Sequence, residues 1–255
     1  MSKTGIDPAV SRRFASTARL FSAADFARLR QAHVAVVGLG GVGSWAVEAL
    51  VRSGVGAVTL VDMDHVAESN LNRQVQAMHT TLGMAKGQAL RDRALDIAQD
   101  CAVTLVDEFL SPENAAELMG DSGVNVWIDA TDDLSAKRAM VLIMKSTKRP
   151  KDLVVSGGAG GKTDPTRVEV TDLAEATQDA LLSTLRYDLR KHHGFPRQGK
   201  LRVQTVVCRQ PMVKTADCDP SAKLACAGYG SLITVTATMG LVAANVAIFR
   251  ALEKR

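Results

Sequence analysis

The stretch VAVVGLGGVGSWAVEALVRSGVGAVTLVDMD, residues 34–64, has the pattern of a strand, a glycine-rich turn, a helix and a second strand. Residues 34–37 are all apolar, as in a strand buried within a parallel sheet. Asp62 follows Gly43, the last glycine of the turn, by 19 residues. This spacing is typical of a dinucleotide-binding fold, in which the acid binds a ribose. The stretch by itself therefore predicts a nucleotide site and leaves open which nucleotide is bound.

The composition is that of an ordinary globular protein. The chain has 255 residues, of which 46% are hydrophobic and 23% charged, with a formal net charge of +4. Its N-terminus, MSKTGIDPAVSRR, lacks the apolar run of a signal peptide. The four cysteines form no C-x-x-C pair, so we expect reduced thiols and a cytoplasmic protein.

Alternating strands and helices predict an α/β fold with a Rossmann-like, doubly wound, mainly parallel sheet. The predicted strands cover residues 34–37, 57–62, 103–106, 124–129 and 153–156. The predicted helices cover residues 11–31, 44–53, 81–100 and 134–147. From residue 167 the pattern changes, and RVEV (167–170) and LRVQTVV (201–207) predict antiparallel strands in an irregular C-terminal third. Without a long linker, we expect a single domain over residues 1–255.

The segment of residues 230–249, GSLITVTATMGLVAANVAIF, has no charge over 20 residues, the length of a membrane-spanning helix. It also contains three threonines, a serine and an asparagine, and it starts beside glycines. A central helix buried between a sheet and a dimer partner has the same composition. We expect this buried helix and no integral membrane span; membrane association through residues 230–249 is the alternative.

Polar and charged residues follow the predicted strands at the edge of the sheet where ligands bind in such folds. They are Asp62, Asp64, Asn70, Arg73, Lys86, Asp129 and Asp132. An arginine and a lysine beside the ribose acid suit a triphosphate better than NAD, because both can neutralise phosphate oxygens. The glycine turn and the following helix N-terminus would hold phosphate through backbone N–H groups. A carboxylate at this edge also suits Mg²⁺ shared with phosphates. We therefore predict ATP.

These motifs resemble one family closely. G-x-G-G-x-G, D-x-D, N-x-N-R-Q, a lysine and D-x-T-D, in this order, are similar to the ubiquitin-activating-type (ThiF/MoeB-like) adenylating superfamily. The resemblance covers residues 12–150 and implies a nucleotide-binding part there, with residues 151–255 serving the substrate, tRNA and the dimer. The C-x-x-C pairs typical of the sulfur-carrier activators of this superfamily are missing.

Three further segments resemble the tRNA threonylcarbamoyladenosine dehydratase branch of this superfamily. They are RFASTARLF (13–21), SGGAGGKTDPTRVEVTDLAEATQDALLSTLR (156–186) and CAGYGS (226–231). The resemblance implies ATP-dependent activation of the carboxylate of N6-threonylcarbamoyladenosine in tRNA, followed by ring closure with net loss of water. The alternative within the superfamily is adenylation of the C-terminus of a small ubiquitin-like sulfur-carrier protein.

The resemblance also implies residue roles. Gly38, Gly40, Gly41 and Gly43 would form the phosphate turn and Asp62 would bind the ribose, with Asp64 beside it. Asn70, Arg73 and Lys86 would line the triphosphate, Asp132 would hold Mg²⁺, and Asp129 would support this loop. Arg19 would reach across a homodimer to the γ-phosphate.

Two further features leave alternatives open. Cys226 lies in the C-terminal cysteine motif of the branch, where it is either a functional thiol linked to a cysteine desulfurase and its sulfur acceptor, or a small buried hydrophobe. The GGAGG loop (157–161) with Asp164 could bind a monovalent cation, Na⁺ or K⁺.

The segment of residues 186–202, the basic stretch, has six cations against one acid, Asp188. The cations are Arg186, Arg190, Lys191, Arg197, Lys200 and Arg202. Contact with tRNA phosphates explains such a cluster, and a solvated loop is the alternative.

Overall fold

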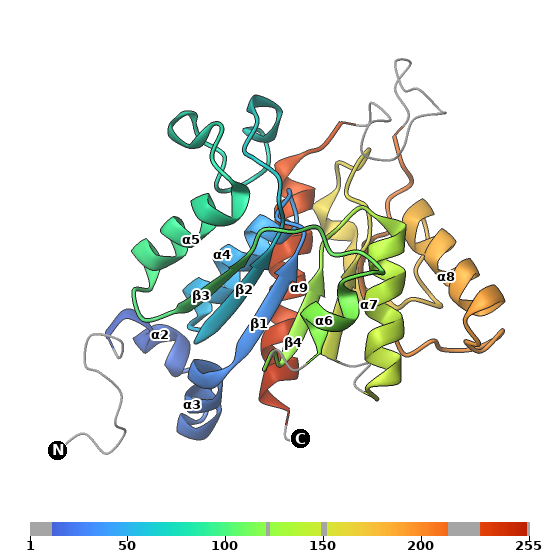
Figure 1. Ribbon diagram of the computed structural model, residues 1–255, viewed down its shortest axis with the longest axis horizontal. Coiled ribbons are helices and arrows are strands. Elements are labelled where there is room, and N and C mark those ends of the chain that lie inside the picture. Colours follow the sequence, from blue (N-terminus) through green and yellow to red (C-terminus); the bar gives the residue numbers. More distant parts are fainter. Residues whose placement is uncertain (1–11, 121–122, 149–151, 214–229, 254–255) are drawn as a thin grey trace.

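Seven strands form one sheet in the order β3-β2-β1-β4-β5-β7-β6 (Figure 1). The computed structural model describes residues 12–120, 123–148, 152–213 and 230–253. The strands are β1 (His33–Val37), β2 (Ala57–Val61), β3 (Ala102–Val106), β4 (Val126–Asp129), β5 (Leu153–Ser156), β6 (Val168–Asp172) and β7 (Gln204–Cys208). All neighbouring pairs are parallel except β6 with β7, which confirms the predicted α/β class.

The C-terminal strands extend the same sheet. β7 pairs in parallel with β5 and in antiparallel with β6, so this part continues the nucleotide-binding sheet. The predicted strand over residues 201–207 was wrong for its first residues. The amides of Leu201 and Arg202 donate to the Asp172 carboxylate at 2.9 and 2.7 Å, and Arg202 has a φ of 60°. The strand therefore begins at Gln204.

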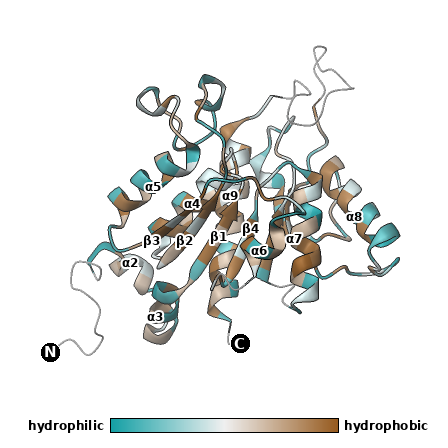
Figure 2. Cartoon of the chain, in the orientation of Figure 1, coloured by the Kyte–Doolittle hydropathy of each residue, from teal (hydrophilic) through white to brown (hydrophobic). Residues whose placement is uncertain are grey.

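Helices cover both faces of the sheet. The first face is covered by α2 (Ala15–Ala18), α3 (Ala23–Gln31), α4 (Gly43–Ser53), α5 (Lys86–Ile97) and α9 (Ile233–Leu252). The second is covered by α6 (Ala115–Met119), α7 (Leu134–Ser146) and α8 (Ala180–His192). Figure 2 shows brown, hydrophobic residues along the strands and α9, whereas the turns of α5 alternate between teal and brown.

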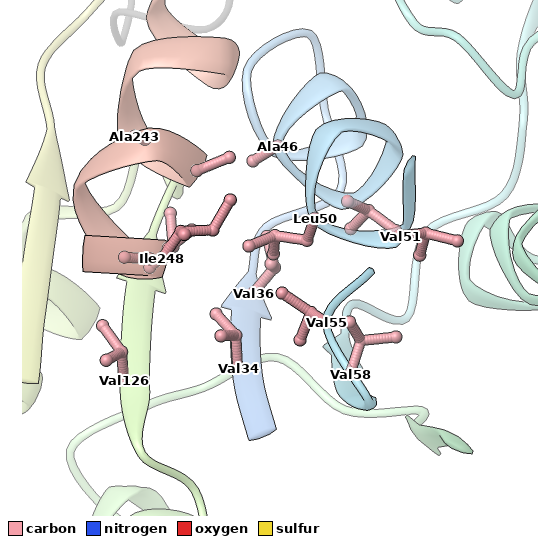
Figure 3. Packing of buried hydrophobic residues seen from close by; sticks show 14 of the residues in the cluster. Val34, Val36, Ala46, Leu50, Val51, Val55, Val58, Val126, Ala243 and Ile248 are labelled. Carbon is pink, nitrogen blue, oxygen red and sulfur yellow. The ribbon is translucent and has the colours of Figure 1, made fainter. Parts of the chain in front are cut away.

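The strands bury both of their faces, which explains their continuous apolar runs. In β1, Val34 and Val36 belong to one core cluster, whereas Ala35 and Val37 belong to the other. Figure 3 shows the first cluster, in which Val34 and Val36 lie beneath α4. One apolar strand therefore serves two cores.

Two predicted helices were wrong in extent. The helix expected over residues 11–31 is interrupted after Ala18, because the Ser22 hydroxyl accepts from the Asp25 amide and starts α3 there. Leu20, which lies within this expected helix, is 80% exposed. The helix expected over residues 81–100 begins only at Lys86, because Gly83 has a φ of 81° and His65 forms a β-bridge with Ala85.

Helix α9 lies in the core of the fold. In the part of the chain that the structure describes, it is the one helix long and apolar enough by composition to cross a membrane. It packs against α4, α3, β4, β5 and β7, and Figure 3 shows Ala243 of α9 facing Ala46 of α4. Its buried residues include Met239, Ala244 and Ala247, all with no exposed surface. These contacts agree with the predicted packing against the sheet, whereas Leu241 and Phe249 are 47% and 55% exposed and the predicted dimer partner stays a prediction.

Gly240 sets the distance between α9 and α4. A Cβ atom on Gly240 would lie 2.3 Å from the Val42 carbonyl oxygen and 2.9 Å from the Trp45 Cβ. We expect Gly240→Ala to lower the free energy of unfolding by about 1–3 kcal/mol, the usual cost of overpacking. Urea unfolding measures this change.

Gly87→Ala is the matched control within α5. A Cβ at Gly87 would meet Leu105 at an ordinary 3.5 Å, so helix propensity should stabilise this variant by up to ~1 kcal/mol. Equal stability changes in the two variants would contradict the packing role of Gly240.

Candidate active site

A cleft of about 880 Å³ opens at the carboxyl ends of the central strands. Val37 of β1 and Val61 of β2 line it together with Ala130, which follows β4, and Gly157, which follows β5. The strand order reverses at β1, since β2 lies on one side of it and β4 on the other. Such a reversal opens a crevice at the strand ends where ligands bind in open α/β sheets. The predicted site therefore lies at the expected edge.

The glycine turn lies at the centre of the cleft. Gly38 has a φ of 84°, and a Cβ at Gly43 would lie 1.9 Å from the Gly38 carbonyl oxygen. Only glycine therefore fits at Gly43, where α4 begins against the turn. Gly40 and Gly41 line the cleft. Together with the N-terminus of α4, the turn forms a phosphate-binding geometry of the predicted kind.

Asp62 fixes this turn from the end of β2. One carboxylate oxygen accepts from the Leu39 amide at 2.6 Å, and the other accepts from the Asp64 amide at 2.8 Å. The residue is 8% exposed and lines the cleft. Each oxygen retains a lone pair for a ribose hydroxyl. The structure thus gives the predicted ribose acid a second role, in holding the turn.

The predicted triphosphate residues gather on one wall of the cleft. The Lys86 Nζ atom lies 2.7 Å from the Asp64 carboxylate, with 8% of the lysine side chain exposed. The Arg73 guanidinium donates to the Ser69 carbonyl and to Asn72, each at 2.8 Å. Both cations line the cleft, and so does Asn70, whose side chain accepts from the Ala67 amide.

The two acids that follow β4 differ in their environments. Asp132 is exposed, lines the cleft and makes no hydrogen bond or ion pair with any described residue. Mg²⁺ prefers oxygen ligands and is held by one or two carboxylates plus phosphates, so this free carboxylate fits the predicted metal role. Asp133 instead caps α7 by accepting from the Ala136 amide.

Asp129 is fully buried and does not line the cleft. Its carboxylate lies 3.1 Å from the Lys137 Nζ atom and accepts from Thr131. Lys137 also donates to the Ser156 carbonyl at 2.8 Å, so the pair joins β4, α7 and β5. Asp129 was a candidate at the ligand edge of the sheet, but its burial away from the cleft lining corrects that placement. Its support of the loop after β4 agrees with the prediction.

The wall opposite Lys86 comes from the C-terminal half. Gly157–Gly160 and the start of α8 line it, together with the buried Lys162 and Asp179. Asp179 accepts from the Gly158 amide at 2.8 Å and from the Leu182 amide at 2.9 Å, and so ties the loop to α8. The Lys162 Nζ atom donates to the Cys208 carbonyl at 2.6 Å and lies 3.8 Å from Asp179. The sequence pattern pointed to GGAGG but not to Asp179. The one feature that could have indicated Asp179 is its position directly before an apolar helix, where an aspartate often caps the helix.

Arg19 lies away from this cleft and is exposed, and its guanidinium makes no hydrogen bond or ion pair with any residue that the structure describes. The arm that holds it is anchored by Phe14, which is 2% exposed and lies against the Arg13 and Arg30 guanidiniums. Both arginines pair with Asp100. Any role of Arg19 at the cleft therefore requires a second copy of the chain.

Two buried thiols and several other predicted features have no part in the cleft. Cys101 and Cys208 are free, and burial raises the pKa of the Cys101 thiol to about 11. Cys226 lies outside the described residues. Asp164 accepts from the Thr166 amide and hydroxyl and does not line the cleft. A monovalent cation at the GGAGG loop stays a prediction.

The basic stretch runs along α8 and the following loop, toward the other edge of the sheet (Figure 1). Arg186 donates to the Leu173 and Ala176 carbonyls at 3.1 and 2.6 Å, so it has a structural role. Asp188, the one acid of the stretch, pairs with Arg138 and His193. The remaining cations of the stretch have no acidic partner among the described residues.

Comparison with known proteins identifies the family. The ThiF family model matches residues 12–254. The chain belongs to the ThiF family. A tRNA threonylcarbamoyladenosine dehydratase of Haemophilus influenzae is 40% identical over 96% of this chain and 95% of its own length. An enzyme with the same description from Escherichia coli K12 is also 40% identical, over 98% of this chain and 97% of its own length.

The fold comparison agrees. A crystal structure of the E. coli tRNA N6-threonylcarbamoyladenosine dehydratase in complex with ATP has a TM-score of 0.87 and 40% identity, and covers 96% of both chains. A complex of the same enzyme with AMP matches equally well. The match to this ThiF-family fold thus extends over the C-terminal strands as well as the nucleotide-binding part.

Lys86 offers a direct test of the cleft. We expect Lys86→Ala to weaken ATP binding about 10- to 150-fold, because the loss of a charge-assisted hydrogen bond costs roughly 1.5–3 kcal/mol. Isothermal titration calorimetry measures the dissociation constant. Lys148→Ala is the control, since Lys148 is exposed beyond the end of α7 and does not line the cleft. A Lys86→Ala protein that stays folded and binds ATP like the wild type would contradict this assignment.

Proposed function

We propose that this protein is an ATP-dependent tRNA threonylcarbamoyladenosine dehydratase. The observation that supports this most strongly is similarity over nearly the whole chain to enzymes of that description, together with a cleft that combines a glycine turn, two cations and a free carboxylate. The substrate is N6-threonylcarbamoyladenosine in tRNA, and its carboxylate is activated as an acyl adenylate. We place the enzyme in the cytoplasm.

In the first step, a substrate carboxylate oxygen forms a bond to the α-phosphorus of ATP, and the bond to pyrophosphate breaks. The glycine turn at Gly40 and Gly41 holds the phosphates through backbone N–H groups, and Asp62 binds the ribose. Lys86 and Arg73 neutralise the charge that gathers on the leaving pyrophosphate. Mg²⁺, when bound with the nucleotide at Asp132, supplies further positive charge to the phosphate oxygens.

In the second step, a heteroatom of the same threonylcarbamoyl group attacks the activated acyl carbon and loses its proton, and the acyl–phosphate bond breaks to release AMP. Relative to the substrate, the product has lost one water. Because the attacking group and the acyl carbon belong to the same molecule, the effective concentration of the attacking group is high. The remaining task of the protein is to orient the threonylcarbamoyl group and exclude water. The wall formed by Gly157–Gly160 and the start of α8 faces the nucleotide wall across the cleft. This arrangement supports a division into a nucleotide-binding part, residues 12–150, and a substrate part, residues 151–255.

The single decisive experiment measures both the exchange step and the product. Purified protein with ATP and tRNA that contains threonylcarbamoyladenosine should exchange labelled pyrophosphate into ATP. Mass spectrometry of the tRNA nucleosides should show the cyclic product. Lys86→Ala should do neither.

Adenylation of a sulfur-carrier protein predicts a different outcome. Exchange would then depend on a small protein that ends in Gly-Gly, and tRNA would have no effect. The molybdopterin-synthase adenylyltransferase of Salmonella typhimurium is 34% identical to this chain, but over only 51% of it. A sulfur-transfer partner at Cys226 belongs to the same set of hypotheses and can be tested by Cys226→Ser.

The active unit in this proposal is a homodimer in which Arg19 of one copy contacts the γ-phosphate bound to the other. Two facts support it: Arg19 has no partner among the described residues, and its arm is held by the Phe14 and Asp100 contacts. A free guanidinium on an anchored arm is suited to bind phosphate in a second copy.

Mixed dimers test this arrangement. Arg19→Ala and Asp132→Ala should each be nearly inactive as pure proteins, because each removes one charge from every site. After subunit exchange, one site of each mixed dimer contains both substitutions and the other contains neither. Activity should return to roughly a quarter of the wild-type value, since half the dimers are mixed and half their sites are intact. Verified exchange without recovery would show that Arg19 acts within its own subunit or only in folding.

A further inference from the structure

A second cavity, of about 430 Å³, lies near the amino end of β5, whereas the nucleotide cleft lies at the carboxyl ends of the strands. It opens between the last turn of α7 and the loop that joins α8 to β7, beside Leu153 at the start of β5. Its floor is apolar and buried. The floor residues are Val141, Met144, Leu153, Phe195, Leu201 and Val203.

Three cations surround this floor: Lys145, Lys200 and Arg202, all exposed. None of them forms an ion pair within the described part of the chain. Lys145 donates to the His193 and Gly194 carbonyls at 3.1 and 3.3 Å, and its Nζ atom lies 4.0 Å from the centre of the Phe195 ring. No acidic side chain among the described residues therefore offsets its charge at the opening.

The acids near this cavity already have partners. Asp172 accepts from the amides of Leu201 and Arg202, and Asp188 pairs with Arg138 and His193. Asp152, next to Leu153, takes part in an interaction of its own. No acidic side chain lines the cavity among the described residues. Nearby Arg190, Lys191 and Arg197 also lack an acidic partner in the described part of the chain, whereas Arg52 and Arg93 on another face pair with Glu48. The excess positive charge therefore covers the surface around this cavity.

The shape and charge select the chemistry of a ligand. An apolar floor favours a flat, weakly polar group, and three unpaired cations at the opening favour an anion attached to it. A nucleoside phosphate combines both, and 430 Å³ is within the usual range of small-molecule pockets.

Helix α8 connects the two cavities. Ala180 at its start lines the nucleotide cleft, and Gly194, just after its end, lines the second cavity. Thirteen residues of helix span about 20 Å, or roughly six steps of a helical nucleic acid. One RNA can therefore occupy both places.

We propose that this second cavity binds a nucleoside phosphate, namely an unstacked nucleotide of the tRNA whose modified base occupies the cleft. This inference rests on the proposed function for the identity of the RNA. A free nucleotide has the same chemistry and is the alternative source of the bound nucleoside phosphate. The cavity would fix the position of the tRNA at a distance from the reaction and so contribute to substrate choice.

Two matched pairs of variants separate the cavity from general positive charge. Lys200→Ala and Lys145→Ala each remove a cation at the cavity. Arg197→Ala and Lys148→Ala remove cations from the same loop and the same helix end that do not line it. Binding of an anticodon stem–loop RNA is measured by fluorescence anisotropy at several salt concentrations, and ATP binding by calorimetry.

The two cavity variants should bind the RNA about tenfold more weakly, with a log-affinity against log-salt slope shallower by roughly one unit. The two controls should change affinity less than threefold, and ATP binding should stay at the wild-type value in all four. If the wild type binds the RNA and all four variants lose affinity equally, the cavity inference is overturned while the proposed function stands.

Cytidine monophosphate distinguishes the two sources. Suppose that Lys200→Ala leaves the affinity for the RNA unchanged but abolishes binding of cytidine monophosphate, and that Arg197→Ala binds this nucleotide normally. The cavity would then bind a free nucleotide, and the proposal that its ligand is part of the tRNA would be wrong. If the wild type binds neither the RNA nor this nucleotide outside the ATP cleft, the cavity inference is overturned. Failure of the tRNA-dependent pyrophosphate exchange would separately reject the proposed function.

Discussion

The contact between the glycine turn and the start of α4 is the constraint on which the rest of the structure depends. Gly43 approaches the Gly38 carbonyl so closely that no side chain fits between them, and the Asp62 carboxylate holds the Leu39 amide from the neighbouring strand. This clamp fixes where β1, β2 and α4 meet. Because the strand order reverses at the same place, the cleft opens directly above the turn. The cleft that the other site residues line is arranged around that turn.

Two sets of charged side chains in this protein differ in whether they have a partner of opposite charge. One group is buried and paired, as in Asp129 with Lys137, which joins β4, α7 and β5. Removal of one partner from such a pair usually costs about 3–5 kcal/mol, so these charges hold the framework of the site. The other group has no acidic or basic partner in the described residues and includes Arg19, Asp132 and Lys200. We assign these three to ligands, because their charge is not neutralised within the described residues; Lys86, which we also assign to ATP, is paired with Asp64.

Helix α9 shows that composition alone does not distinguish a membrane-spanning helix from a helix packed inside a globular fold. By length and hydropathy it could cross a membrane, yet it lies across α4 and four strands of the sheet. Gly240 permits the close approach, and small residues such as Ala243 and Ala244 continue the contact. A helix buried on several sides needs the same apolar composition as one in lipid. Its partners in the fold therefore distinguish the two cases.

Local sequence patterns were sufficient to predict the fold class, the parallel strands along the chain and the residues that line one wall of the cleft. Those features depend on local patterns: apolar runs, a glycine turn and polar residues at fixed distances after strands. It misplaced the starts of α5 and β7, where backbone groups pair with distant residues, as the amides of Leu201 and Arg202 do with Asp172. The sequence placed Asp129 among the candidates at the ligand edge, because a strand-end position does not reveal that a buried lysine from α7 pairs with the carboxylate.

Only the tertiary structure brought Gly157–Gly160 and the start of α8 to the cleft, and only it divided the basic stretch by function. Arg186 donates to backbone carbonyls, whereas Lys200 and Arg202 lie at the opening of a cavity completed by α7. No spacing along the chain encodes these contacts, because they join segments that meet only when the sheet has formed. The physical reason is that a pattern records the conformation of neighbours in sequence, whereas a site depends on neighbours in space.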